Sequence, residues 1–316
     1  MTGFPTFPSA ETFRQWRMNP SQWLPVAIDI ARAHGLPHAA PHVFPTGTNL
    51  VVVLDDKLIL KIFPPLLRRQ FLSERAALSQ LRGRLEIPIP EIVLQGERDN
   101  WPYLAITRLE GVVGSEAWPL LREDEKKSVL RQIGETIAAV QRAPIGKLAD
   151  VEPQWAPFVA AQIAGCRARH IRLGLPRKYW DGLDEILSEA ADLVPLDAPP
   201  VILTGEYIPE NFLLGRRADG WRLSGLIDFG DVMTGWGEYD LLGPSAFMLA
   251  GLPGRVRSFF GGFGYGPADM NGALARRLMI LLLLHRASDP IRHIAIEGWQ
   301  EKTASLRELE RLLWPF

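Results

Sequence analysis

Asp228 and Asn211, in the second half of the chain, have the residue types and spacing of a magnesium site. Asp228 follows an apolar segment and begins the tripeptide Asp228-Phe229-Gly230. Asn211 lies 17 residues earlier, with two short β segments expected between them, so a hairpin would bring the two side chains together. Mg²⁺ prefers hard oxygen ligands and usually takes one or two carboxylates plus phosphate oxygens. The pair therefore indicates a metal that contacts the phosphates of a nucleotide.

Glu206 lies five residues before Asn211, in Thr204-Gly205-Glu206-Tyr207-Ile208-Pro209-Glu210-Asn211. In kinase catalytic loops a carboxylate accepts the proton of the acceptor hydroxyl, and an Asn five residues later binds a metal. The spacing predicts that Glu206 is the catalytic base. The alternative is that Glu206 and Asn211 are solvated loop residues.

Lys61 and Glu74 could hold the nucleotide phosphates from the first half of the chain. Lys61 lies in the apolar segment Leu58–Phe63, where an unpaired ammonium is costly. Glu74, on the helix expected next, could pair with it, as a strand Lys and a helix Glu do in kinases. The alternative is an edge-strand lysine that points to water. The order of Lys61, Glu74, Glu206 with Asn211, and Asp228 favours kinase-like phosphoryl transfer.

The elements that must position these residues divide the chain into two lobes. Residues 1–109 predict a small N-lobe with an antiparallel sheet and one helix that packs on it. Residues 110–316 predict a larger, mainly helical C-lobe, with the hinge at Arg108–Gly111. The fold class is therefore α+β with a two-lobed, protein-kinase-like architecture. The strands expected in the N-lobe are Val43–Thr46, Asn49–Leu54, Lys57–Phe63, Glu91–Gln95 and Tyr103–Leu109, and the helices are Pro25–His34 and Leu66–Arg82.

The C-lobe pattern is helical with three short β segments. The expected helices are Asp124–Arg142, Pro153–Ile171, Tyr179–Val194, Pro267–Ala287 and Ile291–Leu313. The β segments are Val201–Leu203, Phe212–Leu214 and Trp221–Ile227. Clefts between lobes commonly hold small-molecule sites, so we expect the site there.

Composition excludes several function classes. The 316 residues are 47% hydrophobic and 22% charged, which is typical of a globular protein. Lys plus Arg (35) balance Asp plus Glu (36), so no basic excess indicates a nucleic-acid partner. The single cysteine, Cys166, excludes a disulfide framework and a cysteine zinc site. Without a signal-peptide pattern, and with Leu278–Leu284 as the longest apolar run, we expect a soluble cytoplasmic protein with no membrane partner.

Over roughly residues 40–290 the sequence resembles the aminoglycoside phosphotransferase family of kinase-like enzymes. The strings that carry the likeness are Gly47-Thr48-Asn49, Lys61-Ile62-Phe63, Trp101-Pro102-Tyr103-Leu104, Leu226–Asp231 and Tyr239-Asp240-Leu241. Those of the N-lobe look closest to hygromycin-type phosphotransferases. The resemblance implies an enzyme that uses ATP or GTP with Mg²⁺ to phosphorylate a hydroxyl of a small molecule. An aminoglycoside-like or other aminosugar acceptor, and a role in antibiotic resistance, would follow.

Several residues are expected at the nucleotide. Thr46, Gly47 and Thr48 lie between the first two strands, where backbone amides and two hydroxyls could contact phosphates. The same residues also fit an ordinary hairpin turn. By the resemblance, the adenine would contact the backbone of Thr107 and Leu109 at the hinge.

The loop departs from the pattern His-Gly-Asp-x-His-Pro-x-Asn that is usual in this family. Thr204, Glu206 and Ile208 replace the first His, the Asp and the second His. Glu and Asp have similar reference pKa values, but the extra methylene moves the carboxylate. A catalytically weak pseudoenzyme therefore stays an alternative, as does a kinase of another metabolite such as a choline-like amine, a sugar or a nucleoside. The short segment between Asp228 and Tyr239 disfavours protein-kinase activity.

A polycationic acceptor would need carboxylates beyond those at the metal. Asp231, Glu210 and Glu238 are the candidates, and Trp236 could stack on an acceptor ring or simply pack in the core. Asp240 is interpreted as the cap of the helix that follows it.

Overall fold

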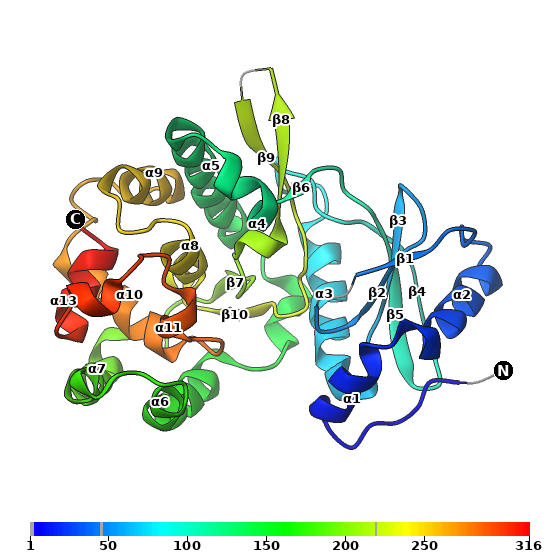
Figure 1. Ribbon diagram of the computed structural model, residues 1–316, viewed down its shortest axis with the longest axis horizontal. Helices are drawn as coiled ribbons and strands as arrows, with labels where there is room; N and C mark the ends of the chain where they lie inside the picture. Colours follow the sequence, from blue (N-terminus) through cyan, green and yellow to red (C-terminus); the bar gives the residue numbers. More distant parts are fainter. Residues whose placement is uncertain (1–2, 45–46, 219) are drawn as a thin grey trace.

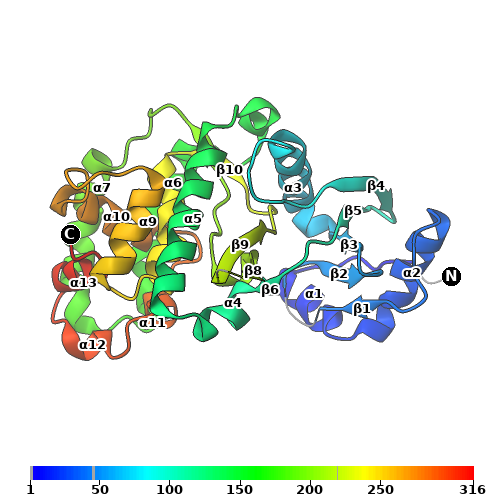
Figure 2. The ribbon, with the colours of Figure 1, turned by 90° about the horizontal axis from the view of Figure 1, so that it is seen from above.

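The computed structural model describes residues 3–44, 47–218 and 220–316. Figures 1 and 2 show two lobes, one built on a sheet with helices against it and the other mostly helical. The N-lobe sheet has the strand order β1-β2-β3-β5-β4. Its strands are β1 (His42–Val43), β2 (Leu50–Val53), β3 (Leu58–Ile62), β4 (Ile92–Arg98) and β5 (Trp101–Thr107). Strand β3 is central, so the edge-strand interpretation of Lys61 is wrong.

Helices cover both faces of this sheet. Helix α3 (Arg68–Leu81) packs on one face through the core that contains Leu104 and Ile106. Helices α1 (Ala10–Arg17) and α2 (Leu24–Ala33) share a second core with Leu60, Ile62 and other residues of the opposite face. Because neighbouring residues of a strand point to opposite faces, Lys61 lies on the α3 side. The sheet therefore directs this lysine toward the helix that carries Glu74.

The C-lobe contains two small sheets among its helices. The hairpin of β8 (Phe212–Arg217) and β9 (Gly220–Leu226) pairs with β6 (Val112–Val113), and β7 (Val201–Leu203) pairs with β10 (Met233–Gly235). The longer helices are α5 (Glu123–Arg142), α6 (Trp155–Arg172), α7 (Trp180–Leu193), α9 (Pro253–Phe263), α10 (Gly272–Leu284) and α13 (Leu306–Leu313). The shorter ones are α4 (Gly114–Ala117), α8 (Leu242–Phe247), α11 (Pro290–His293) and α12 (Trp299–Lys302).

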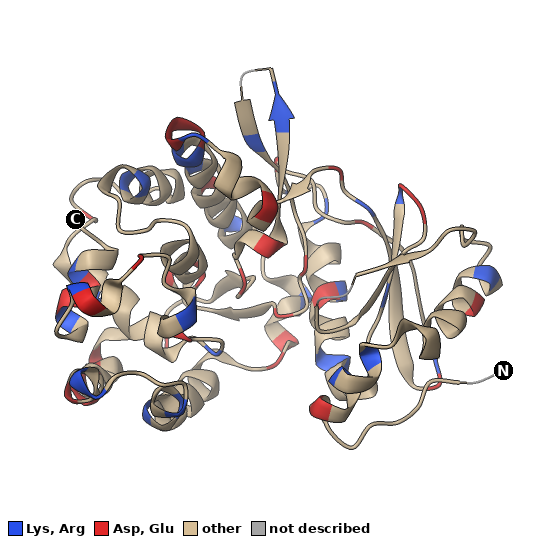
Figure 3. Ribbon diagram, in the orientation of Figure 1, with Lys and Arg blue, Asp and Glu red and all other residues tan. Residues whose placement is uncertain are grey.

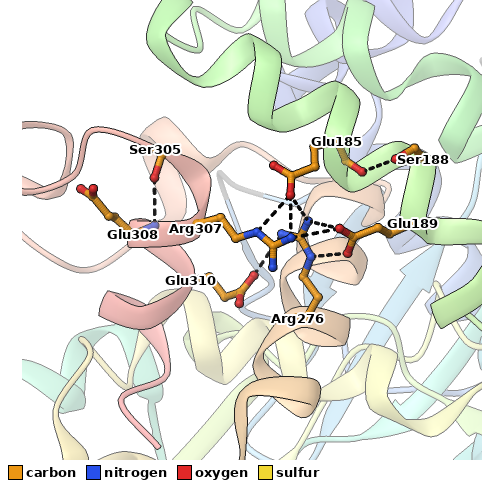
Figure 4. Close-up of polar contacts among 8 residues, drawn as sticks. All are labelled: Glu185, Ser188, Glu189, Arg276, Ser305, Arg307, Glu308 and Glu310. Atoms are coloured by element: carbon orange, nitrogen blue, oxygen red, sulfur yellow. Dashed lines mark hydrogen bonds and ion pairs between the residues drawn. The ribbon is translucent and has the colours of Figure 1, made fainter.

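Helix α10 runs through the centre of the C-lobe. Asn271 caps it by accepting the N–H groups of Ala273 and Leu274, and nearly every residue from Leu274 to Leu284 is buried. Arg276 is a charged residue among these buried ones, and a cluster of carboxylates surrounds it (Figure 4). Its guanidinium lies 2.6 Å from Glu189 on α7 and 3.2 Å from Glu310 on α13. One buried cation therefore joins three helices.

Most expected elements are confirmed, but the prediction of one long helix over Ile291–Leu313 is wrong. The segment forms α11, α12 and α13 instead. Gly298, with φ of +63°, interrupts it in a conformation that favours glycine, and Ser305 starts a new helix by accepting the N–H of Glu308. Helix α1, capped by Ser9, was not predicted, and neither was α9.

The chain enters the C-lobe directly after β5. Strand β6 already pairs with β8, so we propose residue 109 as the boundary between the lobes. Acidic and basic residues are distributed over both lobes (Figure 3). Among the helices of the described ranges, none is both long enough and apolar enough to span a membrane.

Candidate active site

Lys61 joins the two lobes at the site. Its Nζ lies 2.6 Å from Glu74 Oε2 and 2.9 Å from Asp228 Oδ1. Burial alone would lower the pKa of Lys61, but Asp228 and Glu74 outweigh this effect and hold the pKa above its ordinary value. The ammonium is therefore charged, and it lies between two carboxylates.

Glu74 fixes the lysine from α3. The carboxyl is buried, and burial raises its pKa to about 7 although Lys61 and the N–H of Phe229 favour the charged form. The contact with Phe229 also ties α3 to the segment that carries Asp228. A helix residue thus aligns groups from both lobes.

Asp228 lies at the end of the hairpin, as expected. The N–H of Ile227 donates to the carbonyl of Asn211 at 2.9 Å, which brings the two predicted metal ligands to the same end of β8 and β9. Asp228 has φ of +62°, a strained conformation for a non-glycine residue, and its Oδ1 accepts the N–H of Gly230. Its side chain is 44% exposed, so a ligand can reach it.

Asn211 is buried and its orientation is fixed by the loop. Its Nδ2 donates to the carbonyl of Glu206 at 3.0 Å, which leaves Oδ1 as an acceptor. An amide oxygen and a carboxylate are ligands that suit Mg²⁺. Among the described residues, no group of three or more His, Cys, Asp or Glu could form a metal site. The donor set therefore fits a metal that completes its coordination with phosphate oxygens and water.

Glu206 lies beside two other carboxylates, those of Asp231 and Asp228. Burial raises the pKa of its carboxyl to about 7, and the nearby Asp231 and Asp228 raise it further while Arg286 opposes them. A hydrogen bond with Asp231 adds to the shift. At neutral pH this carboxyl is close to its titration midpoint, which suits a group that accepts a proton.

The loop from Thr204 to Asn211, called the catalytic loop below, is held from beneath by Asp240. The two carboxylate oxygens of Asp240 accept the N–H groups of Thr204 and Gly205, each at 2.9 Å. His285 contacts the carbonyl of Gly205 at 3.1 Å. The helix-cap interpretation of Asp240 is therefore wrong, since this carboxylate satisfies backbone donors 35 and 36 residues away.

Asp231 is engaged by arginines rather than open to a ligand. Its Oδ1 lies 3.0 Å from Arg69 on α3 and 3.1 Å from Arg286, just after α10. Gln70 donates to its other oxygen at 3.4 Å. Asp231 thus binds the lobes together, and its charge is balanced without an acceptor.

Two of the other predicted acceptor contacts, Glu238 and Trp236, meet at Arg277, and Glu210 lies apart from that pair. Glu238 is buried and paired with Arg277 at 2.7 Å, and Tyr265 donates to it. Trp236 is partly buried, packs against the core and lies under the guanidinium of Arg277. These contacts fit the packing alternative for Trp236, and they pair the Glu238 carboxylate within the protein. Glu210 is exposed and near His293.

The expected nucleotide contacts lie in two places along the chain, residues 46–48 and the hinge at Thr107 and Leu109. Thr46 lies outside the described residues. Gly47 and Thr48 are exposed. At the hinge, the N–H of Thr107 donates to the carbonyl of Glu91 at 2.9 Å. The N–H of Leu109 has no hydrogen-bond partner within the described part of the chain, so it is available to a base.

Three residues at the site were missed by sequence reasoning. Arg69, Gln70 and Arg286 all contact Asp231, and Gln70 also accepts from Asn49. No spacing rule links them to Asp231, because it lies 55 to 162 residues away from them. The sequence signal for two of them was the polar pair Arg69 and Gln70 in the first turn of the helix that carries Glu74.

A cavity of about 250 Å³ opens beside the catalytic loop. Its wall includes Glu206 and Ile208 from the loop, Ala246 and Phe247 from α8, and residues of the segment from His285 to Ile294. The carboxylate of the predicted base thus borders a space that could hold an acceptor. Asp231, Glu238 and Trp236 do not line it.

Comparison with known proteins gives matches to sequence and to structure. A family model described as "Phosphotransferase enzyme family" matches residues 46–271. The aminoglycoside 3'-phosphotransferase of Streptomyces ribosidificus is 29% identical over 157 residues, which are 47% of this chain and 54% of that protein. The chain spans about half the length of the curated relatives it matches.

Two solved structures illustrate the likeness in fold. The GDP complex of wild-type aminoglycoside 2'-phosphotransferase-IIIa has a TM-score of 0.67 at 17% identity, covering 90% of this chain and 97% of that one. The macrolide 2'-phosphotransferase of Brachybacterium faecium has a TM-score of 0.58 at 15% identity, covering 82% of this chain and 90% of that one. The two-lobed, kinase-like fold expected from the sequence is confirmed.

Proposed function

This chain belongs to the phosphotransferase enzyme family, and on that premise we propose that it transfers the γ-phosphoryl group of ATP or GTP to a hydroxyl of a small molecule. The observation that carries the proposal is the position of Lys61, whose ammonium contacts Glu74 and Asp228 from opposite lobes. In phosphoryl transfer the protein acts mainly by positioning and by electrostatic stabilisation, and these groups supply both.

The nucleotide side of the site uses residues of both lobes. Lys61 contacts the α- and β-phosphates and Glu74 holds Lys61 in place, while the exposed Gly47 and Thr48 offer backbone amides and a hydroxyl to the phosphates. Thr107 and Leu109 contact the base through their backbone. Asp228 and Asn211 would hold Mg²⁺, which would neutralise charge on the phosphate oxygens when bound.

Glu206 acts on the acceptor. Its carboxylate accepts the proton of the hydroxyl, the hydroxyl oxygen forms a bond to the γ-phosphorus, and the bond to the β–γ bridging oxygen breaks to release ADP or GDP. Asp240 and His285 are positioning residues, because they fix the backbone that carries Glu206. A consumer of ATP or GTP belongs in the cytoplasm, where we propose that this enzyme acts.

The relatives suggest antibiotic acceptors. The curated relatives are named aminoglycoside phosphotransferases, and one structural neighbour is named a macrolide phosphotransferase. An enzyme of this kind would give resistance to the antibiotic that it modifies. Kinases of other small alcohols share every nucleotide-side residue, so the acceptor must be identified by experiment.

The test is transfer of labelled γ-phosphate from Mg·ATP to a panel of hydroxyl compounds, with nucleotide binding measured alongside by calorimetry. We expect at least one phosphorylated product, and a loss of about 10²- to 10⁴-fold in rate for Glu206→Gln with nucleotide binding retained. Nucleotide binding without any product, and identical behaviour of Glu206→Gln, would instead identify a protein that binds ATP without turnover. Absence of nucleotide binding would overturn the proposal.

A further inference from the structure

The cavity beside the catalytic loop has a largely apolar wall. Ile208, Ala246, Phe247 and Ile294 contribute apolar side chains, and Glu206 lies at its edge. Apolar ligand surface binds favourably against such a wall because both surfaces leave water. Against these four apolar side chains an ammonium group would lose its hydration without gaining a partner.

The ionisable groups of the wall offer little to a cation. Burial lowers the pKa of His285 to about 4 and also lowers the pKa of His293, so both rings are neutral at pH 7. Asp289 accepts the N–H of Arg292 and lies 3.6 Å from its guanidinium. The remaining ionisable group of the wall is Glu206, and its carboxylate is needed to accept the proton of the reacting hydroxyl.

Two carboxylates of the site outside this wall are also occupied. Asp231 is paired with Arg69 and Arg286, and Glu238 with Arg277. A ligand with several ammonium groups needs several unpaired carboxylates, because each desolvated charge must be balanced. Among the described residues, the exposed Glu210 near His293 is one further carboxylate, and one is too few for such a ligand.

Ser288 provides a polar contact of a different kind. It is 5% exposed and lines the cavity, and its hydroxyl has no hydrogen-bond partner among the described residues. A buried hydroxyl without a partner is unfavourable unless a ligand supplies one. This hydroxyl therefore points to a ligand with a neutral hydrogen-bonding group.

We infer that the cavity binds an acceptor with an apolar body and at most one cationic group, which presents a hydroxyl to Glu206 and forms a hydrogen bond with Ser288. The inference rests on the proposed function, because Glu206 defines which end of the ligand reacts. The chemical class is an uncharged or monocationic glycoside or alcohol with an apolar ring. A polycationic aminosugar binds poorly.

The first experiment measures binding without nucleotide, by calorimetry on the full chain. The probes are phenyl β-glucoside (uncharged, with an apolar ring), a macrolide (an apolar body with one amine) and kanamycin (a polycation). We expect phenyl β-glucoside or the macrolide to bind at least about tenfold more tightly than kanamycin. Kanamycin as the tightest ligand, or no binding of any of the three, would overturn the inference.

Two variants test the wall itself. Ser288→Ala should weaken binding of the preferred probe by about 3- to 10-fold, as for loss of one hydrogen bond, while the exposed Ser188→Ala on α7 should not. Phe247→Asp, at a partly exposed position, should weaken apolar probes and strengthen kanamycin binding. Thermal unfolding and Mg·ATP binding show that each variant is folded. Unchanged affinities in both Ser288→Ala and Phe247→Asp would contradict the proposal.

The same probes are then used as acceptors with Mg·ATP, so that the two proposals are tested separately. Selective binding without phosphoryl transfer would refute the proposed function and leave the ligand class supported. Transfer with kanamycin as the best acceptor would refute the ligand class and leave the proposed function supported.

Discussion

Glu206 lies in an environment that opposes its negative charge. Its pKa is raised to about 7 by burial, then by Asp231 and Asp228. A base must be ionised, so kcat/KM should rise about tenfold per pH unit below pH 7 and level off above it. Replacing Asp231 by Asn removes the second-largest cause of the shift and leaves Arg286 beside Glu206. We therefore expect the midpoint of the pH profile of Asp231→Asn to move to lower pH.

The control for this profile is Asp184→Asn. Asp184 is an exposed carboxylate that is paired with Arg167 and does not perturb Glu206, so its removal should leave the midpoint unchanged. An identical acid limb in wild type and Asp231→Asn would show that Asp231 does not set the protonation of the base. If the acid limb of the pH profile disappears in Glu206→Gln, the group that titrates in it is Glu206.

Lys61 is the second residue whose environment permits a sharp prediction. Lys61→Met removes the cation between Glu74 and Asp228, so two carboxylates then face each other in a buried site. Removing one partner of a buried pair costs about 3–5 kcal/mol, and we expect a loss of this order in the free energy of unfolding. We also expect at least a hundredfold fall in kcat/KM for ATP. Urea unfolding and steady-state kinetics measure the two effects.

Lys57→Met is the matched control, since Lys57 is an exposed lysine just before the same strand. It should change stability by less than about 0.5 kcal/mol. Equal effects of the two substitutions would show that the strand tolerates loss of either charge and that Lys61 has no special role.

At this scale the sequence anticipated which residues come together on the nucleotide side, but not those expected on the acceptor side. Lys61 was identifiable because an apolar strand with one lysine must bury or pair it, and Glu74 and Asp228 because they follow it in the order usual in kinases. Asp231 and Glu238 were not, because their arginine partners come from α3 and from the region of α10. Whether a carboxylate is open to a ligand depends on such distant partners.

Between elements, the cluster around Arg276 makes a prediction about stability. The side chain is buried in α10 and bonded to Glu189 of α7 and Glu310 of α13 (Figure 4). Arg276→Ala leaves the buried Glu310 without its cation, so we expect a loss of about 3–5 kcal/mol in the free energy of unfolding. The measurement is urea unfolding followed by circular dichroism.

Arg307→Ala is the control for the same cluster. Arg307 contacts Glu185 and Glu189, but its side chain is 43% exposed. Exposed ion pairs contribute about 0–1 kcal/mol, so the loss should stay within that range. A larger loss from Arg307→Ala than from Arg276→Ala would contradict the central role of the buried guanidinium.

The prediction of elements failed where one apolar pattern extended over several local breaks. The segment 291–313 has helical spacing, yet Gly298 and Ser305 divide it into separate helices. Conversely, α1 is a short helix in an aromatic-rich segment, and it is stabilised by contacts with Trp101 that no local pattern contains. Long helices such as α5 were predictable because their amphipathic pattern extends over many turns.

The whole molecule is held together across the lobes by charged pairs at the site itself. Lys61 with Asp228 and Arg69 with Asp231 connect the N-lobe to the C-lobe, and the N–H of Leu226 donates to the carbonyl of Pro88. Bound Mg·ATP would replace the first of these pairs by contacts with phosphate and metal. Ligand binding and the joint between the lobes are therefore coupled.

This coupling predicts how the metal affects stability. A ligand that binds only the folded chain at 100 times its Kd stabilises it by about 2.7 kcal/mol, so saturating Mg·ATP should raise Tm by several degrees. Chelation of Mg²⁺ with EDTA should remove most of this rise, because Asp228 then faces the phosphates without a cation between them. In Asp228→Asn the rise should no longer depend on Mg²⁺, whereas Asp184→Asn should behave like wild type. If Mg²⁺ raised Tm equally in wild type and Asp228→Asn, the metal would be held elsewhere, and the assignment of Asp228 as its ligand would be wrong.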